Sequence, residues 1–306
     1  MRIENIGEFE IHDGRFRRYA LPGSRLEKLA GGFGFIEGPV WFADGEFLLF
    51  SDIPNDRMYR WVEGLGCSVF RAPSRFSNGN TRDLQGRLVT CEHGSRTVTR
   101  TELDGSVTVL ADRYRGKRLN SPNDAAVKSD GSVWFTDPPY GILSDEQGHK
   151  AESEIGACLV FRLDPSTGDL EAVAEDFSKP NGIAFSPDER LLYVSDTGYS
   201  HDKALPRWIR VFDVEDGRRL ENGREFARID KGVADGFRLD ADGNVWTSAR
   251  DGAQCFSPRG ELLGKVLVPE TVANLTFGGP ERNRLFLTAS TSLYAIRVGA
   301  RGAQRP

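Results

Sequence analysis

The chain has 306 residues, a formal net charge of −5 and 39% apolar residues, which is enough to form a sizeable core. No stretch approaches the roughly 18 consecutive apolar residues of a membrane-spanning helix, and no cluster of Lys and Arg marks a nucleic-acid surface. We therefore expect neither a membrane nor a nucleic acid as a partner. The polar start and four cysteines without CxxC spacing favour a cytoplasmic protein with free thiols.

A nine-residue phrase recurs six times and divides the chain into repeats. Each copy opens with an acid or an amide and runs through a short segment to a turn, and a second apolar run follows. The openers are Glu37, Asn78, Asn123, Asn181, Asp235 and Asn274, spaced by 41, 45, 58, 54 and 39 residues. Such a period, built from short strands, is typical of a β-propeller with one blade per repeat. The sequence predicts an all-β fold, a single six-bladed β-propeller over 1–306 with four-stranded antiparallel blades.

The region before the first repeat supplies the strand that the last repeat lacks. Strand-like pieces occur there at FEIH (9–12), FRRYAL (16–21) and LEKLA (26–30), whereas the sixth repeat has only three strands. An N-terminal strand that completes the last blade would close the ring and remove an open sheet edge. We expect residues 1–30 to be an N-terminal extension that carries this closing strand.

Strands inside the repeats are marked by β-branched and aromatic residues between Asp-Gly, Pro-Asp and Ser-Asp turns. In the first repeat we predict strands at 38–42, 47–52, 58–62 and 68–72. In the third repeat we predict strands at 124–128, 133–137, 158–164 and 170–176.

Two segments are too long to be hairpin turns. Residues 138–157 follow the second strand of the third repeat, and residues 197–207 follow the corresponding strand of the fourth. Long polar insertions of this kind are usually functional or disordered. Both leave the same end of adjacent blades, so we interpret 138–157 as a lid-like insertion that 197–207 is able to meet. Surface decoration is the alternative.

Radial repetition brings the six openers to one mouth of the central channel. Glu37 and Asp235 are carboxylates and the other four are amides, which is the oxygen-rich set that a hard divalent cation binds. Asn and Asp before Gly are also common in turns. Six such residues at one repeat position nevertheless favour a metal site.

A second set of polar residues ends the second strands. Its members are Asp52, Glu92 or His93, Asp137 and Asp196. A polar group there is able to orient a ligand or a metal-bound water, or alternatively to cap a turn. Candidate substrate-binding residues are Asn78, Glu92, His93, Asn123, Asp137 and Tyr140.

Four phrases resemble the gluconolactonase, regucalcin and luciferin-regenerating enzyme family. They are EGPVWF (37–42), SPNDAAVKSDGSVWFTDPPYG (121–141), KPNGIAFSPD (179–188) and VADGFRLDADGNVW (233–246). CEHGSRTVTR (91–100) is similar to the bacterial gluconolactonase branch in particular. Over residues 30–290, the resemblance implies a six-bladed propeller with one divalent cation, usually Ca²⁺, with Zn²⁺, Mn²⁺ or Mg²⁺ as alternatives.

The resemblance also implies which residues act. The metal ligands fall on Glu37, Asn181 and Asp235, with Asn123 joining them or holding substrate or water. Regucalcin-like members carry Arg two residues before that Asn, where this chain has Ser121. We therefore expect substrate contacts to differ from theirs.

Hydrolysis of a sugar lactone is the function that the resemblance implies. It requires a polarised carbonyl, an activated water and a stabilised oxyanion. We assign Asp235 as ligand and general base, and Asn123 as the residue that orients the sugar or the water. A Ser-His-Asp triad is disfavoured because the chain has no GxSxG elbow. The alternatives are a phosphotriesterase or diisopropylfluorophosphatase-like hydrolase on the same metal, and a non-enzymatic ligand-binding propeller.

Overall fold

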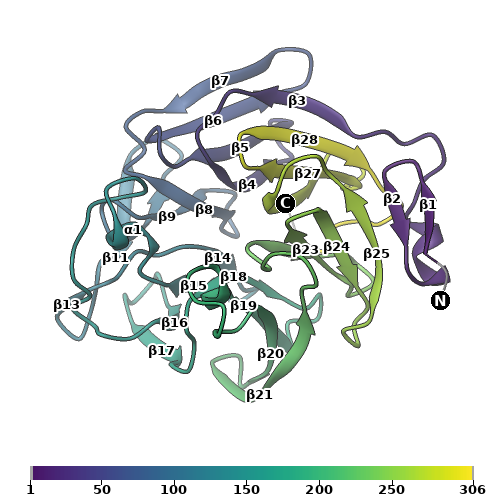
Figure 1. Ribbon diagram of the computed structural model, residues 1–306. Coiled ribbons are helices and arrows are strands. Elements are labelled where there is room, and N and C mark those ends of the chain that lie inside the picture. Colours follow the sequence, from purple (N-terminus) through teal and green to yellow (C-terminus); the bar gives the residue numbers. More distant parts are fainter. Residues whose placement is uncertain (1–2, 305–306) are drawn as a thin grey trace.

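Six antiparallel sheets surround a central axis in the computed structural model, which describes residues 3–304 (Figure 1). Blade 1 contains β4 (Ile36–Phe42), β5 (Phe47–Asp52), β6 (Arg57–Val62) and β7 (Gly66–Arg71). Blade 2 contains β8 (Ser77–Arg82), β9 (Leu88–Glu92), β10 (Thr97–Thr101) and β11 (Val107–Ala111). Blade 3 contains β14 (Ala125–Val127), β15 (Val133–Asp137), β16 (Leu159–Leu163) and β17 (Leu170–Ala174).

The second half of the ring repeats this plan. Blade 4 contains β18 (Pro180–Phe185), β19 (Leu191–Asp196), β20 (Trp208–Glu215) and β21 (Arg219–Arg228). Blade 5 contains β22 (Phe237–Leu239), β23 (Val245–Ala249), β24 (Gly252–Phe256) and β25 (Leu262–Leu267). Blade 6 contains β26 (Val272–Gly278), β27 (Arg284–Ala289), β28 (Ser292–Arg297) and β3 (Glu27–Gly31). The six-bladed β-propeller is therefore confirmed.

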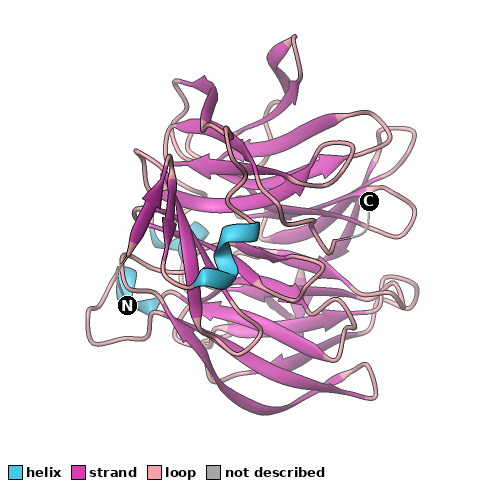
Figure 2. Cartoon of the chain, turned by 90° about the vertical axis from the view of Figure 1, so that its right-hand side faces the viewer, coloured by secondary structure: helices cyan, strands magenta, loops and turns pink. Residues whose placement is uncertain are grey.

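The few remaining elements are short. They are the hairpin β12 (Arg113–Tyr114) and β13 (Lys117–Arg118), the helix α1 (Tyr140–Leu143), and the 3₁₀ turns η1 (Gly14–Arg18) and η2 (Gly198–Ser200). Figure 2 shows how little helix accompanies the strands. No helix in residues 3–304 is long and apolar enough to cross a membrane.

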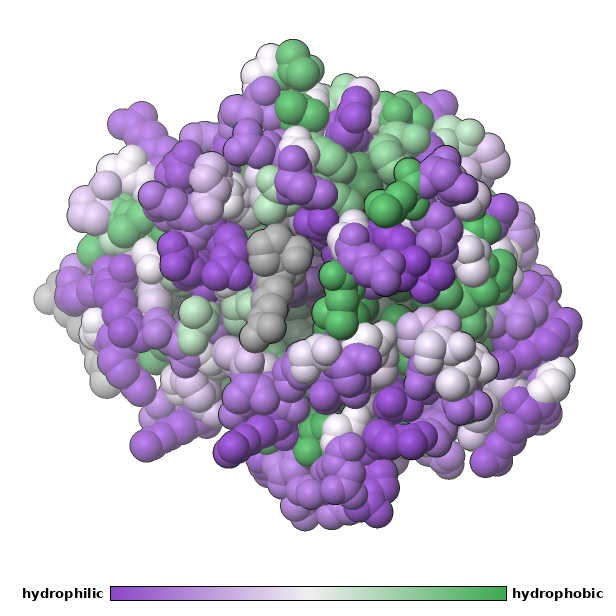
Figure 3. Space-filling view, turned by 180° about the vertical axis from the view of Figure 1, so that it is seen from behind, coloured by the Kyte–Doolittle hydropathy of each residue, from purple (hydrophilic) through white to green (hydrophobic). Residues whose placement is uncertain are grey.

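Burial falls from the axis to the rim of each blade. Every residue of β9 and β15 is buried, whereas β7 and β11 at the rim are mostly half-buried or exposed. Large side chains join adjacent blades: Trp41 stacks on Phe286 with ring centroids 5.4 Å apart, and Trp134 meets Phe185 at 5.4 Å. The core therefore lies between the blades, and it sets the inner strands close together around the channel. The face shown in Figure 3 is mainly hydrophilic.

The N-terminal region closes the ring and also extends blade 5. β3 pairs antiparallel with β28, with Leu293 opposite Ala30, so the predicted closing strand is supplied by LEKLA, one of the three candidate pieces. FEIH forms part of β2 (Phe9–Ile11), which with β1 (Glu4–Ile6) adds a hairpin to the outer edge of β25.

The expectation of a strand at FRRYAL is wrong. This segment contains most of η1, whose first turn is capped by Asp13 accepting a hydrogen bond from the amide of Arg15. The turn directs Phe16 and Tyr19 onto Trp246, with ring centroids 5.7 and 5.8 Å apart. Capping and burial therefore outweigh the β-propensity of the aromatic residues.

Candidate functional site

The six openers form a continuous ring at one mouth of the channel. Hydrogen bonds join each blade to the next at this level. They run from Ser51 Oγ to Asn78 O (2.8 Å), Gly79 N to Asn123 O (2.8 Å), Thr136 Oγ1 to Asn181 O (2.7 Å), Gly182 N to Asp235 O (2.9 Å), Gly236 N to Ala273 O (2.8 Å) and Asn274 Nδ2 to Glu37 Oε2 (2.8 Å). The inner strands thus bring together residues that are up to 237 positions apart.

Glycine follows four of the openers because the neighbouring blade approaches closely. A Cβ atom at Gly182 would lie 2.4 Å from the carbonyl oxygen of Asp235, and one at Gly38 would lie 2.0 Å from that of Asn78. No side chain fits at such distances. Glycine at these positions therefore allows the inner strands of adjacent blades to approach each other closely.

Glu37 and Asp235 are the two carboxylates of the ring. Glu37 is 4% exposed, and its Oε2 accepts hydrogen bonds from Gly38 N (2.6 Å) and Asn274 Nδ2 (2.8 Å). Burial and the nearby charge of Asp235 raise the pKa of Glu37 well above its usual value. Asp235 is only half-buried, but desolvation, helped by the charge of Asp124, raises its pKa to about 7. Neither carboxylate forms an ion pair with a Lys, Arg or His in residues 3–304.

The amides of the ring present oxygen atoms beside these carboxylates. Asn123 and Asn181 are 4% and 6% exposed. Asn181 Nδ2 contacts Thr197 Oγ1 at 3.3 Å, and the Asn181 side chain also hydrogen-bonds Asp235. Asn78 Oδ1 is buried, and within the described part of the chain it has no hydrogen-bond partner.

This donor set fits a hard divalent cation. Two carboxylates that oppose each other's ionisation, together with a buried carbonyl oxygen that lacks a partner, supply the charge and the oxygen ligands that Ca²⁺ prefers. Among residues 3–304, no three His, Cys, Asp or Glu side chains form a group that could hold a metal. Amide oxygens therefore have to complete any site at this mouth.

The acids that end the second strands hold the loops that lead into the openers. Three of them, Asp52, Asp137 and Asp196, accept backbone N–H groups from the residues three and two places before their own openers. The pairs are Asp52 with Gly34 (3.0 Å) and Phe35 (3.2 Å), Asp137 with Asn120 (2.8 Å) and Ser121 (2.8 Å), and Asp196 with Ser178 (2.8 Å) and Lys179 (3.0 Å). Capping of the turn, the alternative interpretation of these acids, matches this geometry.

Asp137 and Glu92 are closed to solvent. Asp137 is 0% exposed with both oxygens bound to backbone amides, and burial raises its pKa to about 7. Glu92 is 1% exposed and accepts hydrogen bonds from Ser95 Oγ (2.6 Å) and Thr99 Oγ1 (2.9 Å). In this arrangement neither carboxylate reaches the channel mouth.

His93 connects the 138–157 insertion to the ring. Its Nε2 lies 3.1 Å from Asn78 Nδ2, and its Nδ1 lies 3.1 Å from the carbonyl oxygen of Gln147. Because an amide nitrogen donates and a carbonyl accepts, the imidazole carries its proton on Nδ1. Burial lowers the pKa of His93 to about 4, so the ring is neutral at pH 7.

Tyr140 joins the two insertions. Its hydroxyl lies 2.6 Å from Thr197 Oγ1, and its ring lies 5.5 Å from that of His201 and 5.0 Å from Lys179 Nζ. The residues 138–157 and 197–207 therefore contact each other beside Asn181, as their positions in the sequence led us to expect.

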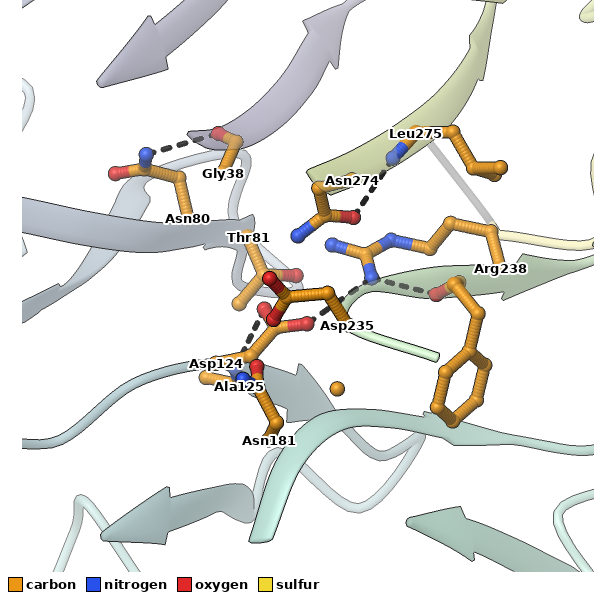
Figure 4. A network of polar contacts seen from close by, with 12 residues as sticks. Gly38, Asn80, Thr81, Asp124, Ala125, Asn181, Asp235, Arg238, Asn274 and Leu275 are labelled. Atoms are coloured by element: carbon orange, nitrogen blue, oxygen red, sulfur yellow. Dashed lines mark hydrogen bonds and ion pairs between the residues drawn. The ribbon is translucent and has the colours of Figure 1, made fainter. Parts of the chain in front are cut away.

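Sequence analysis missed an ion pair inside the ring. Arg238 Nη1 lies 3.3 Å from Asp124 Oδ2, and both side chains are buried (Figure 4). One signal was present in the sequence. Asp124 directly follows an opener, at the place where four other repeats have glycine.

Comparison with known proteins gives a consistent result. Residues 35–291 match the family model described as SMP-30/Gluconolactonase/LRE-like region. The chain is 34% identical to a gluconolactonase of Zymomonas mobilis, over 97% of this chain and 88% of that protein. It is 28% identical to a pentonolactonase of Haloferax volcanii, over 83% and 81% of the two chains.

Solved structures agree with these sequence matches. A Xanthomonas campestris protein, described as a gluconolactonase important in glucose secondary metabolic pathways, superposes with a TM-score of 0.88 at 39% identity, and 94% of each chain is covered. A calcium-binding regucalcin of Agrobacterium tumefaciens has a TM-score of 0.71 at 17% identity, over 90% and 96% of the chains. The latter likeness concerns the fold alone.

Proposed function

We propose that this chain, which belongs to the SMP-30/Gluconolactonase/LRE-like family, hydrolyses a sugar lactone with the help of one divalent cation. The observation that carries the proposal is the pair of mutually repelling carboxylates, Glu37 and Asp235, set in a ring of amides at the channel mouth. The names of the relatives, gluconolactonase and pentonolactonase, support the class of substrate.

Glu37, Asn181 and Asp235 would hold the cation, with Asn123 as a ligand or next to the ligands. All of these are oxygen donors, which favours Ca²⁺ over softer metals, with Mg²⁺, Mn²⁺ and Zn²⁺ as the other candidates. When bound, the cation would supply a Lewis acid that polarises the lactone carbonyl and stabilises the oxyanion.

The two carboxylates take different roles because their surroundings differ. Glu37 is buried and already fixed by two hydrogen bonds, which suits a purely structural ligand. Asp235 is partly open to the mouth, which suits a base that meets water. One of its oxygens accepts the proton of the attacking water while the water oxygen bonds to the carbonyl carbon. The ring C–O bond then breaks, and Asp235 returns the proton to the leaving oxygen, which gives the open hydroxy acid.

Polar side chains that border the mouth and its two insertions are the candidate substrate contacts. We propose that Asn78, Asn123 and Tyr140, which border the mouth and its two insertions, contact the sugar. His93 would act indirectly, by fixing Asn78 and the backbone at Gln147. Glu92 and Asp137 would act through the loops and hydroxyls that they hold.

A panel of substrates tests the proposal. Glucono-lactone, a pentono-lactone and a phosphotriester are assayed with protein treated with a chelator, before and after addition of each candidate cation. We expect hydrolysis of at least one lactone, loss of that activity on chelation and recovery with calcium. Phosphotriester turnover without lactone turnover would instead establish the alternative hydrolase, in which Asn123 is a direct ligand.

A further inference from the structure

Asp124 occupies a place in the ring that four of the other five blades leave without a side chain. The residue after the opener is glycine in blades 1, 2, 4 and 5, at Gly38, Gly79, Gly182 and Gly236. The missing side chains make room for one carboxylate, and a Cβ atom at Gly79 would lie only 2.8 Å from Asp124 Oδ1. Asp124 is 1% exposed, and its charge raises the pKa of both Asp235 and Glu37. It therefore lies inside the same buried electrostatic cluster.

Arg238 reaches this carboxylate from β22 of blade 5. Its Nη1 contacts Asp124 Oδ2 at 3.3 Å and donates to the carbonyl oxygen of Phe237 at 2.7 Å. Figure 4 shows the guanidinium between Asn274 and Asp124, near Asp235. Arg238 is 5% exposed, and its Nε and Nη2 are buried without a hydrogen-bond partner in the described residues.

Such a pair is a poor choice for stability alone. A buried ion pair stabilises a fold little unless further hydrogen bonds satisfy its remaining atoms. Here two guanidinium nitrogens lack a partner. A channel lined by small apolar residues would avoid that cost, which favours a role for the pair other than stability.

The charge of the cluster indicates that purpose. Glu37, Asp124 and Asp235 are three carboxylates, and Arg238 is the one cation paired with any of them in residues 3–304. Fully ionised, the four groups have a net charge of −2, which a single divalent cation neutralises. Without the guanidinium the same buried space would hold a charge of −3.

We propose that Arg238 is the built-in counter-ion of the channel mouth, which matches the charge of the buried cluster to one divalent cation. This inference rests on the proposed function. Arg238 acts on the site by pairing with Asp124. It does not contact the substrate, and its effect reaches the bound cation through Asp124.

Calorimetric titration with calcium chloride tests the proposal through binding rather than turnover. Asp124→Asn leaves the positive charge of Arg238 uncompensated beside the site, so calcium affinity should fall at least about tenfold, or about 1.4 kcal/mol. Arg238→Met should bind calcium at least as tightly as the wild type, while its metal-free melting temperature falls. Asp124→Asn combined with Arg238→Met restores a charge of −2, so its affinity should return to within about threefold of the wild type.

Lys265→Met is the matched control. Lys265 is a buried cation on β25 of the same blade, paired with Asp230 at 2.7 Å and with Asp251 at 3.1 Å, so its removal changes the net charge equally but at the outer strand. We expect this variant to leave calcium affinity unchanged. If Asp124→Asn also leaves it unchanged, or if the double variant fails to recover affinity, the proposal is overturned. Failure of the proposed function looks different, because the wild type itself would then bind no divalent cation.

Discussion

In the proposed function, Asp235 is both a cation ligand and the general base. Its half-exposed side chain lies beside the buried Glu37, and the two carboxylates oppose each other's ionisation. Glu37 is held by Gly38 and Asn274, whereas Asp235 is hydrogen-bonded by the Asn181 side chain and is partly exposed. Substitution of each carboxylate in turn should therefore separate cation binding from general-base catalysis.

Asp235→Asn keeps an oxygen for the cation but removes the basic oxygen. Loss of a general base lowers the rate by about 10²–10⁴-fold, so kcat should fall further than cation affinity does. Glu37→Gln is the matched comparison, and its activity should be partly restored by excess cation. Steady-state kinetics together with calorimetry check both expectations. Full turnover of Asp235→Asn at saturating cation would place the base elsewhere.

The raised pKa of Asp235 predicts a pH dependence of stability in the metal-free protein. Its pKa rises from 3.8 to about 7 on folding, so between these values the folded state binds more protons than the unfolded state. The contribution of Asp235 to the free energy of unfolding therefore decreases as pH rises from about 4 to about 7. Urea unfolding of the wild type and Asp235→Asn across this range isolates that contribution. A difference between the two that is independent of pH would contradict the raised pKa.

At the level of elements, one arrangement of hydrogen bonds recurs in three blades. An acid at the end of the second strand binds the loop that leads into the first, two and three residues before the opener. The opener is therefore placed by a rigid loop as well as by its own strand. This explains how single side chains from separate blades converge accurately without long secondary structures around them.

Asp137→Asn should disrupt these hydrogen bonds in blade 3. The new amide nitrogen would face a backbone N–H, and an unsatisfied buried group costs about 1–3 kcal/mol of stability. Asp112→Asn, a change at an exposed acid (side chain 55% exposed), is the control and should cost less than about 0.5 kcal/mol. Urea denaturation measures both changes. A stability of Asp137→Asn equal to that of the wild type would show that the loop is held by other contacts.

The sequence predicted those features that repeat. The predicted strands 47–52 and 133–137 coincide with β5 and β15, and LEKLA closes the ring as expected. Features that occur only once in the chain could not be recognised from repetition in the sequence. FRRYAL has the composition of a strand, but the cap at Asp13 turns it into η1.

The site shows the same division between repeated and single features. The openers were visible because each repeat contains one. Arg238 lies in β22, and its side chain pairs with Asp124, which is 114 positions away in the sequence. Nothing in the sequence around Arg238 indicates this contact. The burial of Glu92 and Asp137 likewise depends on contacts that form only when the chain folds.

At the level of the whole molecule, both ends of the chain secure the ring. β3 completes blade 6, and Gln304 Nε2 donates to Thr81 Oγ1 of blade 2 at 3.2 Å. Phe9, Phe16 and Tyr19 extend the core of blades 5 and 6. The integrity of the mouth therefore depends on residues remote from it, because hydrogen bonds join each blade to the next at the level of the openers.

Deletion of residues 1–30 should destabilise the entire propeller, since it removes most of β3 together with buried aromatic residues of the core. Deletion of residues 2–6 is the control, because the β1 residues that it removes are exposed. Thermal unfolding should show a large fall in melting temperature for the first deletion and little change for the second. Equal melting temperatures for the long deletion and the wild type would show that the closing strand is dispensable.

The account as a whole is tested most directly by titrating calcium into chelator-treated protein while recording the hydrolysis of glucono-lactone. We predict no enzymatic rate above spontaneous hydrolysis without cation, and recovery that follows occupancy of one site per chain, with the dissociation constant found by calorimetry. Glu37→Gln should shift the curve to higher calcium, and Asp235→Asn should lower its plateau. A rate that chelation leaves unchanged, with cation binding absent, would contradict the assignment of the channel mouth as a cation-dependent lactonase site.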